Sequence, residues 1–202
     1  MAIQPDTRTQ LIEATIAAIA QGGESSVRVS SISAAVGVRE PSVYHFFKNR
    51  KALVEAAQIE RYRSSYMEMI IPFELAVEIS DSLEEFARAT RKILLMIFAP
   101  ERHQMRAIRL NVLGAAQTSR TIMEEVNRTN SLVIAHLAEV LGAARARGWI
   151  TNEFDDKAIG YWIMGQINGR IMAEMNQEDV DLDEWNKVAI EGILAIFNPR
   201  PL

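Results

Sequence analysis

Helical periodicity runs through almost all of this 202-residue chain and limits its fold more than any other feature. Apolar residues recur three and four positions apart, as they do on one face of an α-helix. No stretch alternates apolar and polar residues in the manner of a half-buried β-strand with glycine-rich turns. We therefore predict an all-α fold, with helices over residues 7–22, 30–36, 41–47, 49–66, 81–99, 101–117, 119–147, 155–177 and 183–198.

The absence of cysteine excludes several classes of protein. Without thiols there is no disulfide scaffold, thiol nucleophile, zinc–thiolate site or iron–sulfur cluster. The three histidines, His45, His103 and His136, are too scattered for a metal-binding motif, so we expect no metal and no cofactor. The longest apolar run, Ile93–Ala99, is far shorter than the ~20 residues that span a bilayer. Since the chain starts with polar residues and no signal peptide, we predict a cytoplasmic protein without a membrane partner.

Charge is distributed unevenly along the chain, whose formal net charge is −4. Residues 1–63 contain eight Lys/Arg and six Asp/Glu, whereas residues 64–202 contain fourteen Lys/Arg and twenty Asp/Glu. A basic region on an acidic body is typical of a small nucleic-acid-binding module joined to a larger domain. A solvated basic turn would give the same tally, so the local sequence has to decide between the two.

Residues 30–47 read as a helix, a tight turn at Gly37 and a second helix. Two short helices joined in this way form a helix-turn-helix, whose second helix fits the major groove of DNA. In that second helix the apolar residues Val43, Phe46 and Phe47 recur at helical spacing and are expected to pack inward on Ile16, Ile32 and Val36. The opposite side is polar, aromatic and cationic, with Pro41, Ser42, Tyr44, His45 and Lys48.

Residues 7–56 resemble the DNA-binding domain of the tetracycline-repressor (TetR) family of bacterial regulators. The resemblance rests on a first helix that ends in Gly and on three runs: Ile32-x-x-x-Val36-Gly37-Val38, Ser42-Val-Tyr44-His45-Phe-Phe47 and Lys48-Asn-Arg-Lys-Ala52-Leu53. It implies that Tyr44, His45 and Lys48 bind backbone phosphates, and that Ser30, Glu40, Pro41 and Ser42 face base edges. Arg28 and Arg39 flank the groove and are further candidate phosphate partners.

One position departs from the family pattern. Arg39 stands at the N-cap of the reading helix, where the family usually has Ser or Thr, and a guanidinium cannot accept from backbone N–H groups. We interpret Glu40 as compensating, because a carboxylate is favourable at the positive end of a helix. The alternative is that Glu40 accepts a hydrogen bond from a cytosine amine.

The resemblance also implies a homodimer whose last two long helices form a four-helix bundle with those of the partner. Small and apolar residues on these helices are candidates for that interface: Gly165, Gly169, Ala173, Trp185, Ala189, Gly192, Ile193 and Phe197. The alternative interpretation is that this stripe belongs to the core of a single chain.

A ligand cavity is predicted around the long helix 119–147, whose apolar stripe is interrupted by two polar residues. The candidate lining residues are Met96, Met105, Ile108, Met123, Thr129, Asn130 and Trp162. Core packing would explain the same residues, with Asn130 hydrogen-bonded internally. We expect Arg109 to form a surface ion pair, the alternative being that it binds an acidic ligand, and we assign no role to His103 or His136.

These features predict a helix-turn-helix DNA-binding domain over residues 1–54 and a helical effector-binding and dimerisation domain over 55–202, joined through a shared helix. The expected function is that of a homodimeric transcriptional repressor that a small molecule releases from its double-stranded DNA operator. A di-iron enzyme would need paired Glu-x-x-His motifs, and none occurs. The alternative is an all-helical ligand- or partner-binding protein without DNA-binding activity.

Overall fold

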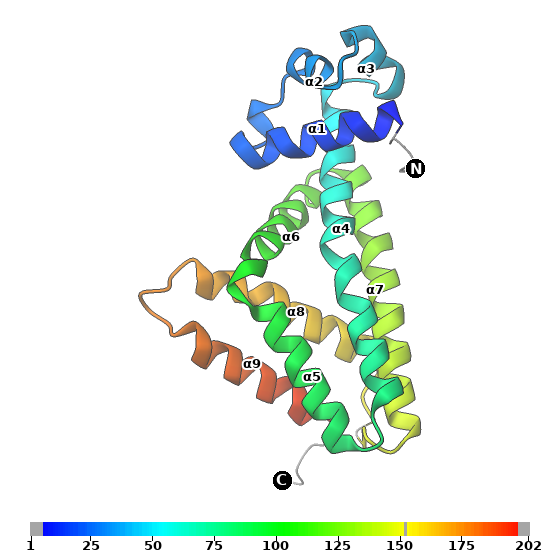
Figure 1. The fold of residues 1–202 in the computed structure, drawn as a ribbon, viewed down its shortest axis with the longest axis vertical. Helices are drawn as coiled ribbons and strands as arrows, with labels where there is room; N and C mark the ends of the chain where they lie inside the picture. The colour runs from blue at the N-terminus through cyan, green and yellow to red at the C-terminus, as the bar shows by residue number, and fades with distance from the viewer. Residues whose placement is uncertain (1–5, 152, 198–202) are drawn as a thin grey trace. The chain divides into compact units, whose positions relative to one another are not determined.

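The computed structural model describes residues 6–151 and 153–197, and the side chains of all of these except residues 67–70. All regular structure in these ranges is helical, as predicted (Figure 1). The helices are α1 (Thr7–Gly22), α2 (Val29–Val36), α3 (Glu40–Phe46), α4 (Arg50–Ile79), α5 (Leu83–Phe98), α6 (His103–Ala116), α7 (Arg120–Ala146), α8 (Asp156–Glu174) and α9 (Leu182–Phe197). Short 3-10 turns precede α2 and α6, at Glu24–Ser26 and Pro100–Arg102. Asn198, the predicted end of the last helix, lies outside the described residues.

The chain divides into two compact units. The N-terminal unit comprises residues 1–64 and 112–126, and the C-terminal unit comprises residues 65–111 and 127–202. Helices α4, α6 and α7 therefore contribute residues to both units. The domain division after residue 54 remains a prediction.

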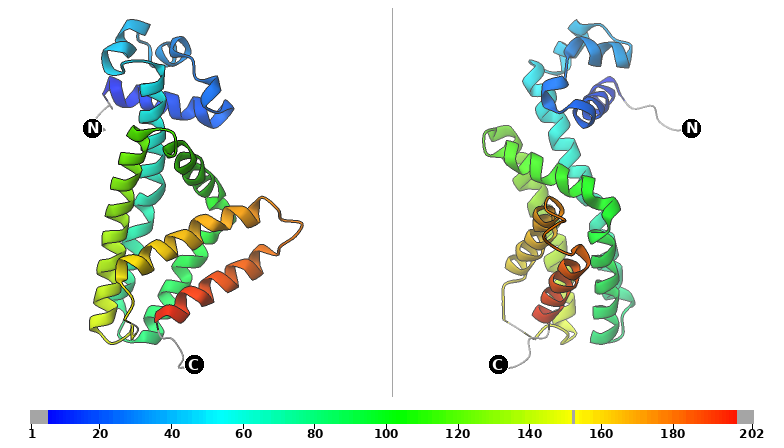
Figure 2. Two further views of the ribbon diagram at one scale, coloured as in Figure 1. Left: turned by 180° about the vertical axis from the view of Figure 1, so that it is seen from behind. Right: turned by 90° about the vertical axis from the view of Figure 1, so that its left-hand side faces the viewer.

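The N-terminal unit packs α1, α2 and α3 around the first turns of α4 (Figure 2). Asp6 caps α1, because its side chain accepts a hydrogen bond from the backbone N–H of Thr9 at 2.7 Å. The core of this unit consists of buried aliphatic side chains and one phenylalanine: Leu11, Ile12, Ile19, Val27, Val29, Ile32, Val43, Phe47, Leu53, Val54 and Ala57. Their spacing along each helix is what the sequence periodicity predicts.

Helix α4 is longer than predicted. The sequence places its end near Tyr66, because Pro72 should interrupt a helix, yet α4 continues through Pro72 to Ile79. Proline in a helix interior removes one backbone hydrogen bond. Beyond it, Ala76 and Val77 are buried in the core of the C-terminal unit. This burial of apolar surface offsets the lost hydrogen bond.

In the C-terminal unit α9 packs against α5 and α8, and α8 and α9 run in opposite directions (Figures 1 and 2). Aromatic side chains fix this packing: Phe86 stacks on Trp149, with ring centroids 5.5 Å apart, and lies 5.4 Å from Phe197. The acidic segment between α8 and α9 supplies a cap, since Asp181 accepts from the backbone N–H of Asp183 at 2.8 Å. None of the helices in the described ranges combines the length and the apolarity needed to cross a bilayer.

Candidate functional site

The turn between α2 and α3 has the geometry of a helix-turn-helix. Gly37 adopts a left-handed conformation with φ of 75° and ψ of 25°, which glycine reaches without steric cost. The backbone N–H of Val38 then donates to the carbonyl of Ser33 at 2.9 Å and closes the end of α2. Pro41 lies in the first turn of α3, and the Arg39 side chain caps nothing, as the sequence predicted.

The predicted DNA-contacting side of α3 is open to solvent. Tyr44 is 49% exposed, and His45 and Lys48 are also exposed. Of the other candidates, Ser42 is half-buried and the rest are exposed: Arg28, Ser30, Arg39, Glu40 and Pro41.

Phe46 corrects one prediction, because it does not pack inward. Its side chain is 40% exposed and meets the edge of His45, with ring centroids 5.2 Å apart. Helix α3 ends at Phe46, and Phe47 already has extended backbone angles (φ −131°, ψ 121°). Helical spacing therefore fails at the last position. Val43 and Phe47 are buried as predicted, whereas Phe46 points to solvent.

The basic side chains near α3 differ in what they bind within the chain. Arg28 donates to the carbonyl of Ser25 at 2.8 Å, and Arg50 donates to the carbonyl of Val27 at 2.9 Å. Within the described part of the chain, Arg39 and Lys48 form no ion pair or hydrogen bond. Their charges are therefore available to an external anion.

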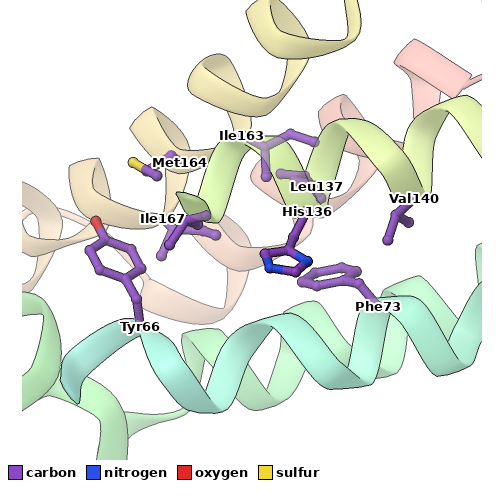
Figure 3. Close-up of a pocket in the computed structure, with 9 residues that line it drawn as sticks. Tyr66, Phe73, His136, Leu137, Val140, Ile163, Met164 and Ile167 are labelled. Carbon is purple, nitrogen blue, oxygen red and sulfur yellow. The ribbon is translucent and has the colours of Figure 1, made fainter. Parts of the chain in front are cut away.

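One cavity in the C-terminal unit, here the apolar cavity, lies between α4, α7 and α8, and the space between its lining atoms and at its open mouth totals about 460 Å³ (Figure 3). Side chains from the three helices line it: Tyr66, Phe73, Val133, His136, Leu137, Val140, Ile163, Met164 and Ile167. His136 is its one ionisable side chain besides Tyr66, and its Nδ1 lies 3.0 Å from a carboxylate oxygen of Glu74. Sequence reasoning assigned none of these residues to a ligand site.

A second cavity, here the arginine cavity, involves α4, α5 and α6, and the space between its lining atoms and at its open mouth totals about 420 Å³. Its lining combines apolar side chains with three guanidinium groups: Pro72, Ile93, Met96, Ile97, Arg102, Met105, Arg106 and Arg109. Two of the predicted ligand residues, Met96 and Met105, are among them.

A buried ionic cluster adjoins the arginine cavity. Arg106, Arg170 and Glu174 are almost completely excluded from solvent, and both guanidinium groups bind Oε1 of Glu174. Arg170 also donates to the side-chain oxygen of Asn186 at 2.8 Å, and Nδ1 of His103 lies 3.0 Å from Oε2 of Glu174.

The cluster shifts the ionisation of its members. Burial alone raises the pKa of Glu174, but hydrogen bonds from Arg106 and His103 outweigh it, and the pKa falls below its ordinary value. Burial and the charge of Arg106 lower the pKa of Arg170. The sequence signal for this cluster is a pair of charges four residues apart, Arg170 and Glu174, inside an otherwise apolar helix.

The helix-turn-helix geometry agrees with the comparison to known families. The model for the bacterial regulatory proteins of the tetR family matches residues 11–57. Residues 11–57 therefore resemble the DNA-binding region of TetR-family regulators. The match indicates a DNA-binding transcriptional regulator, as the sequence predicted.

Similar proteins extend the match beyond the DNA-binding region. The HTH-type transcriptional regulator BetI of Serratia proteamaculans (strain 568) is 26% identical over 152 residues, which cover 67% of this chain and 75% of BetI. A Rhodococcus sp. protein assigned to the TetR family has a TM-score of 0.68 at 20% identity, covering 95% and 98% of the two chains. FadR of Bacillus subtilis, solved in complex with stearoyl-CoA, has a TM-score of 0.63 at 19% identity, covering 96% and 99%.

The remaining predicted ligand residues lie outside the linings of the apolar and arginine cavities. Met123 belongs to the N-terminal unit. Trp162 is 41% exposed on α8, and the others are half-buried: Ile108, Thr129 and Asn130.

Arg109 corrects another prediction, because it is buried and does not lie on the surface. Its Nε donates to Oγ of Ser65 at 3.1 Å, and its guanidinium lies 4.0 Å from the ring centroid of Tyr66.

The predicted dimer residues fall into two groups. Ala189, Ile193 and Phe197 are buried in the core of their own chain, so their assignment to a dimer surface is not retained. Trp185 packs edge-on against Phe98, with ring centroids 5.4 Å apart. The small residues Gly165, Gly169, Ala173 and Gly192 are exposed or half-buried on α8 and α9.

Proposed function

We propose that this protein is a homodimeric repressor of the TetR family. It acts in the cytoplasm, binds a double-stranded DNA operator and releases the operator when a small molecule binds the C-terminal unit. The observation that carries the DNA-binding part is the exposed Tyr44–His45–Lys48 edge of α3, next to cationic side chains that have no partner in the described chain.

The proposed DNA contacts divide by chemistry. Tyr44, His45, Lys48, Arg28 and Arg39 supply hydrogen-bond donors to phosphate oxygens, which give affinity. Ser30, Glu40, Pro41 and Ser42 lie at or near the start of the two helices and supply base-edge contacts, which give sequence preference. Arg28 would first have to release the carbonyl of Ser25.

The outer surfaces of α8 and α9 support the homodimer. Large apolar side chains are left uncovered there: Met172 and Val188 are each 74% exposed, and Tyr161 and Trp162 are also exposed. Gly165 and Gly169 lie on the same helix, and a Cβ at either would meet nothing within 4 Å. Each interior glycine costs about 1 kcal/mol of helix stability, so close approach of a second backbone would explain both. A two-fold axis would also present two α3 helices to two half-sites.

Release of the operator follows from a shift in populations. A ligand that favours one arrangement of the C-terminal unit lowers DNA affinity if that arrangement holds the two reading helices at the wrong spacing. Two cavities in this unit are the candidate binding sites. The similar FadR of Bacillus subtilis was solved with stearoyl-CoA, which supports a ligand-binding role for this fold.

The test measures binding of the purified full-length protein to fluorescent fragments of the DNA upstream of its own gene. We expect saturable binding that unrelated DNA competes poorly, with two protomers or a multiple of two per fragment by analytical ultracentrifugation. Tyr44→Ala should weaken specific binding at least tenfold, while Phe154→Ala, at an exposed aromatic residue outside the proposed DNA and dimer surfaces, serves as the control. Sequence-independent binding alone, or none, would favour the helical binding protein without DNA-binding activity.

A further inference from the structure

The arginine cavity combines apolar walls with guanidinium groups, and the described residues that line it include no carboxylate. We propose that it binds an amphipathic carboxylate: a single anionic head next to Arg106, with an apolar body against the isoleucine and methionine side chains. This inference rests on the proposed function, because it identifies the chemical class of the effector.

The buried ionic cluster has an excess of positive charge. One carboxylate, Glu174, serves two guanidinium groups, Arg106 and Arg170, so the three side chains carry a net charge of +1. The carboxylate of Asp183 acts on Arg170, and His103 adds a further positive charge when it is protonated. Arg106 and Arg170 nevertheless share the single carboxylate that both of them contact. A monoanion that reaches Arg106 from the cavity side supplies this guanidinium with an anion of its own.

Hydrogen bonds within the chain fix the position of the Arg106 guanidinium. Its Nε donates to Glu174, its Nη1 donates to the carbonyl of Ile97 at 2.7 Å, and its Nη2 donates to the carbonyl of Ala99 at 3.1 Å and to Glu174. A guanidinium has five N–H groups, so these contacts leave one Nη1–H without an acceptor. The carbonyl contacts fix the plane of the group, and the remaining N–H is the donor that we assign to the ligand's carboxylate oxygen.

The walls fit the apolar part of the same ligand. Ile93 and Ile97 are buried on α5, and Met105 is half-buried on α6. Methionine adapts its shape to irregular apolar groups. Met96 is 59% exposed, so it lies at the solvent side of the lining. The apolar cavity, by contrast, holds no guanidinium and suits an uncharged molecule.

The experiment compares decanoate with 1-decanol, which has the same chain length and no charge, by titration calorimetry on the full-length protein. We expect decanoate to bind at least tenfold more tightly. Met96→Glu places a negative charge at the solvent side of the cavity without altering a buried side chain, and it should weaken decanoate binding about fivefold or more. Met96→Gln should bind as the unaltered protein does. Leu95→Glu, an exposed neighbour outside the cavity lining, is the matched charge control.

Equal binding of the two probes, or equal loss in Met96→Glu and Leu95→Glu, would overturn the proposal. Operator affinity is measured on the same samples, so the two proposals fail separately. Decanoate binding with no change in operator affinity overturns the effector role alone. Absence of specific DNA binding overturns the proposed function and leaves the carboxylate site standing on calorimetry.

Discussion

Cationic side chains serve different ends in the two units of this protein. In the N-terminal unit Lys48 and Arg39 are exposed and have no partner in the described chain, so water solvates them and the fold does not depend on them. In the C-terminal unit Arg106 and Arg170 are buried and share one carboxylate, so the fold depends on every contact they make. An exposed cationic side chain can bind an external anion. A buried one stabilises the fold and binds only the groups packed around it.

The largest effect expected from this comparison is that of Glu174→Ala. It leaves Arg106 and Arg170 buried beside each other without their shared anion and should lower the free energy of unfolding by about 3–5 kcal/mol. Urea unfolding followed by circular dichroism measures this loss. Glu178→Ala, in the exposed turn after α8, is the control and should be close to neutral. A loss below about 1 kcal/mol would mean that the cluster is as weakly coupled to folding as a surface pair.

The second prediction concerns pH and Glu174. Its pKa is lower in the folded protein than in the unfolded chain, so the cluster contributes its full stability above the ordinary value of 4.5. That contribution is lost as pH falls through the depressed folded pKa. The difference in unfolding free energy between the unaltered protein and Glu174→Gln should therefore be constant near pH 7 and shrink below pH 4.5. A difference that stays the same down to pH 3 would contradict this assignment.

The smallest effect is expected at the exposed surface. Lys48→Ala should leave unfolding unchanged and weaken binding to all DNA sequences alike, because phosphate contacts carry no sequence information. The log–log slope of affinity against salt should flatten by about one unit. Lys157→Ala, an exposed lysine of the C-terminal unit, serves as the control. An unchanged salt slope would remove Lys48 from the phosphate-binding set.

Sequence predicts the DNA-binding region well because its signals are local. Asp6 caps α1, Gly37 ends α2 in a left-handed conformation and Pro41 starts α3, each through chemistry within four residues of itself. The prediction that Phe46 packs inward is wrong at the end of this helix. Helix α3 ends at Phe46, one residue earlier than periodicity suggests.

The C-terminal unit is less predictable because its site depends on contacts between distant segments. Arg106 and Glu174 are 68 residues apart, and nothing near either one in the sequence indicates that they meet. Pro72 is a local signal that predicts the wrong result, because buried residues beyond it keep α4 helical. The methionines of the arginine cavity could be predicted as adaptable lining, whereas its arginines could not, since Arg109 reads as a surface residue.

Pro72 has a mechanical consequence. The backbone hydrogen bonds of a helix resist bending, and proline removes one of them. Pro72 of α4 lines the arginine cavity. The residues of α4 are divided between the two units. A molecule in that cavity would contact α4 at the turn that lacks a backbone hydrogen bond.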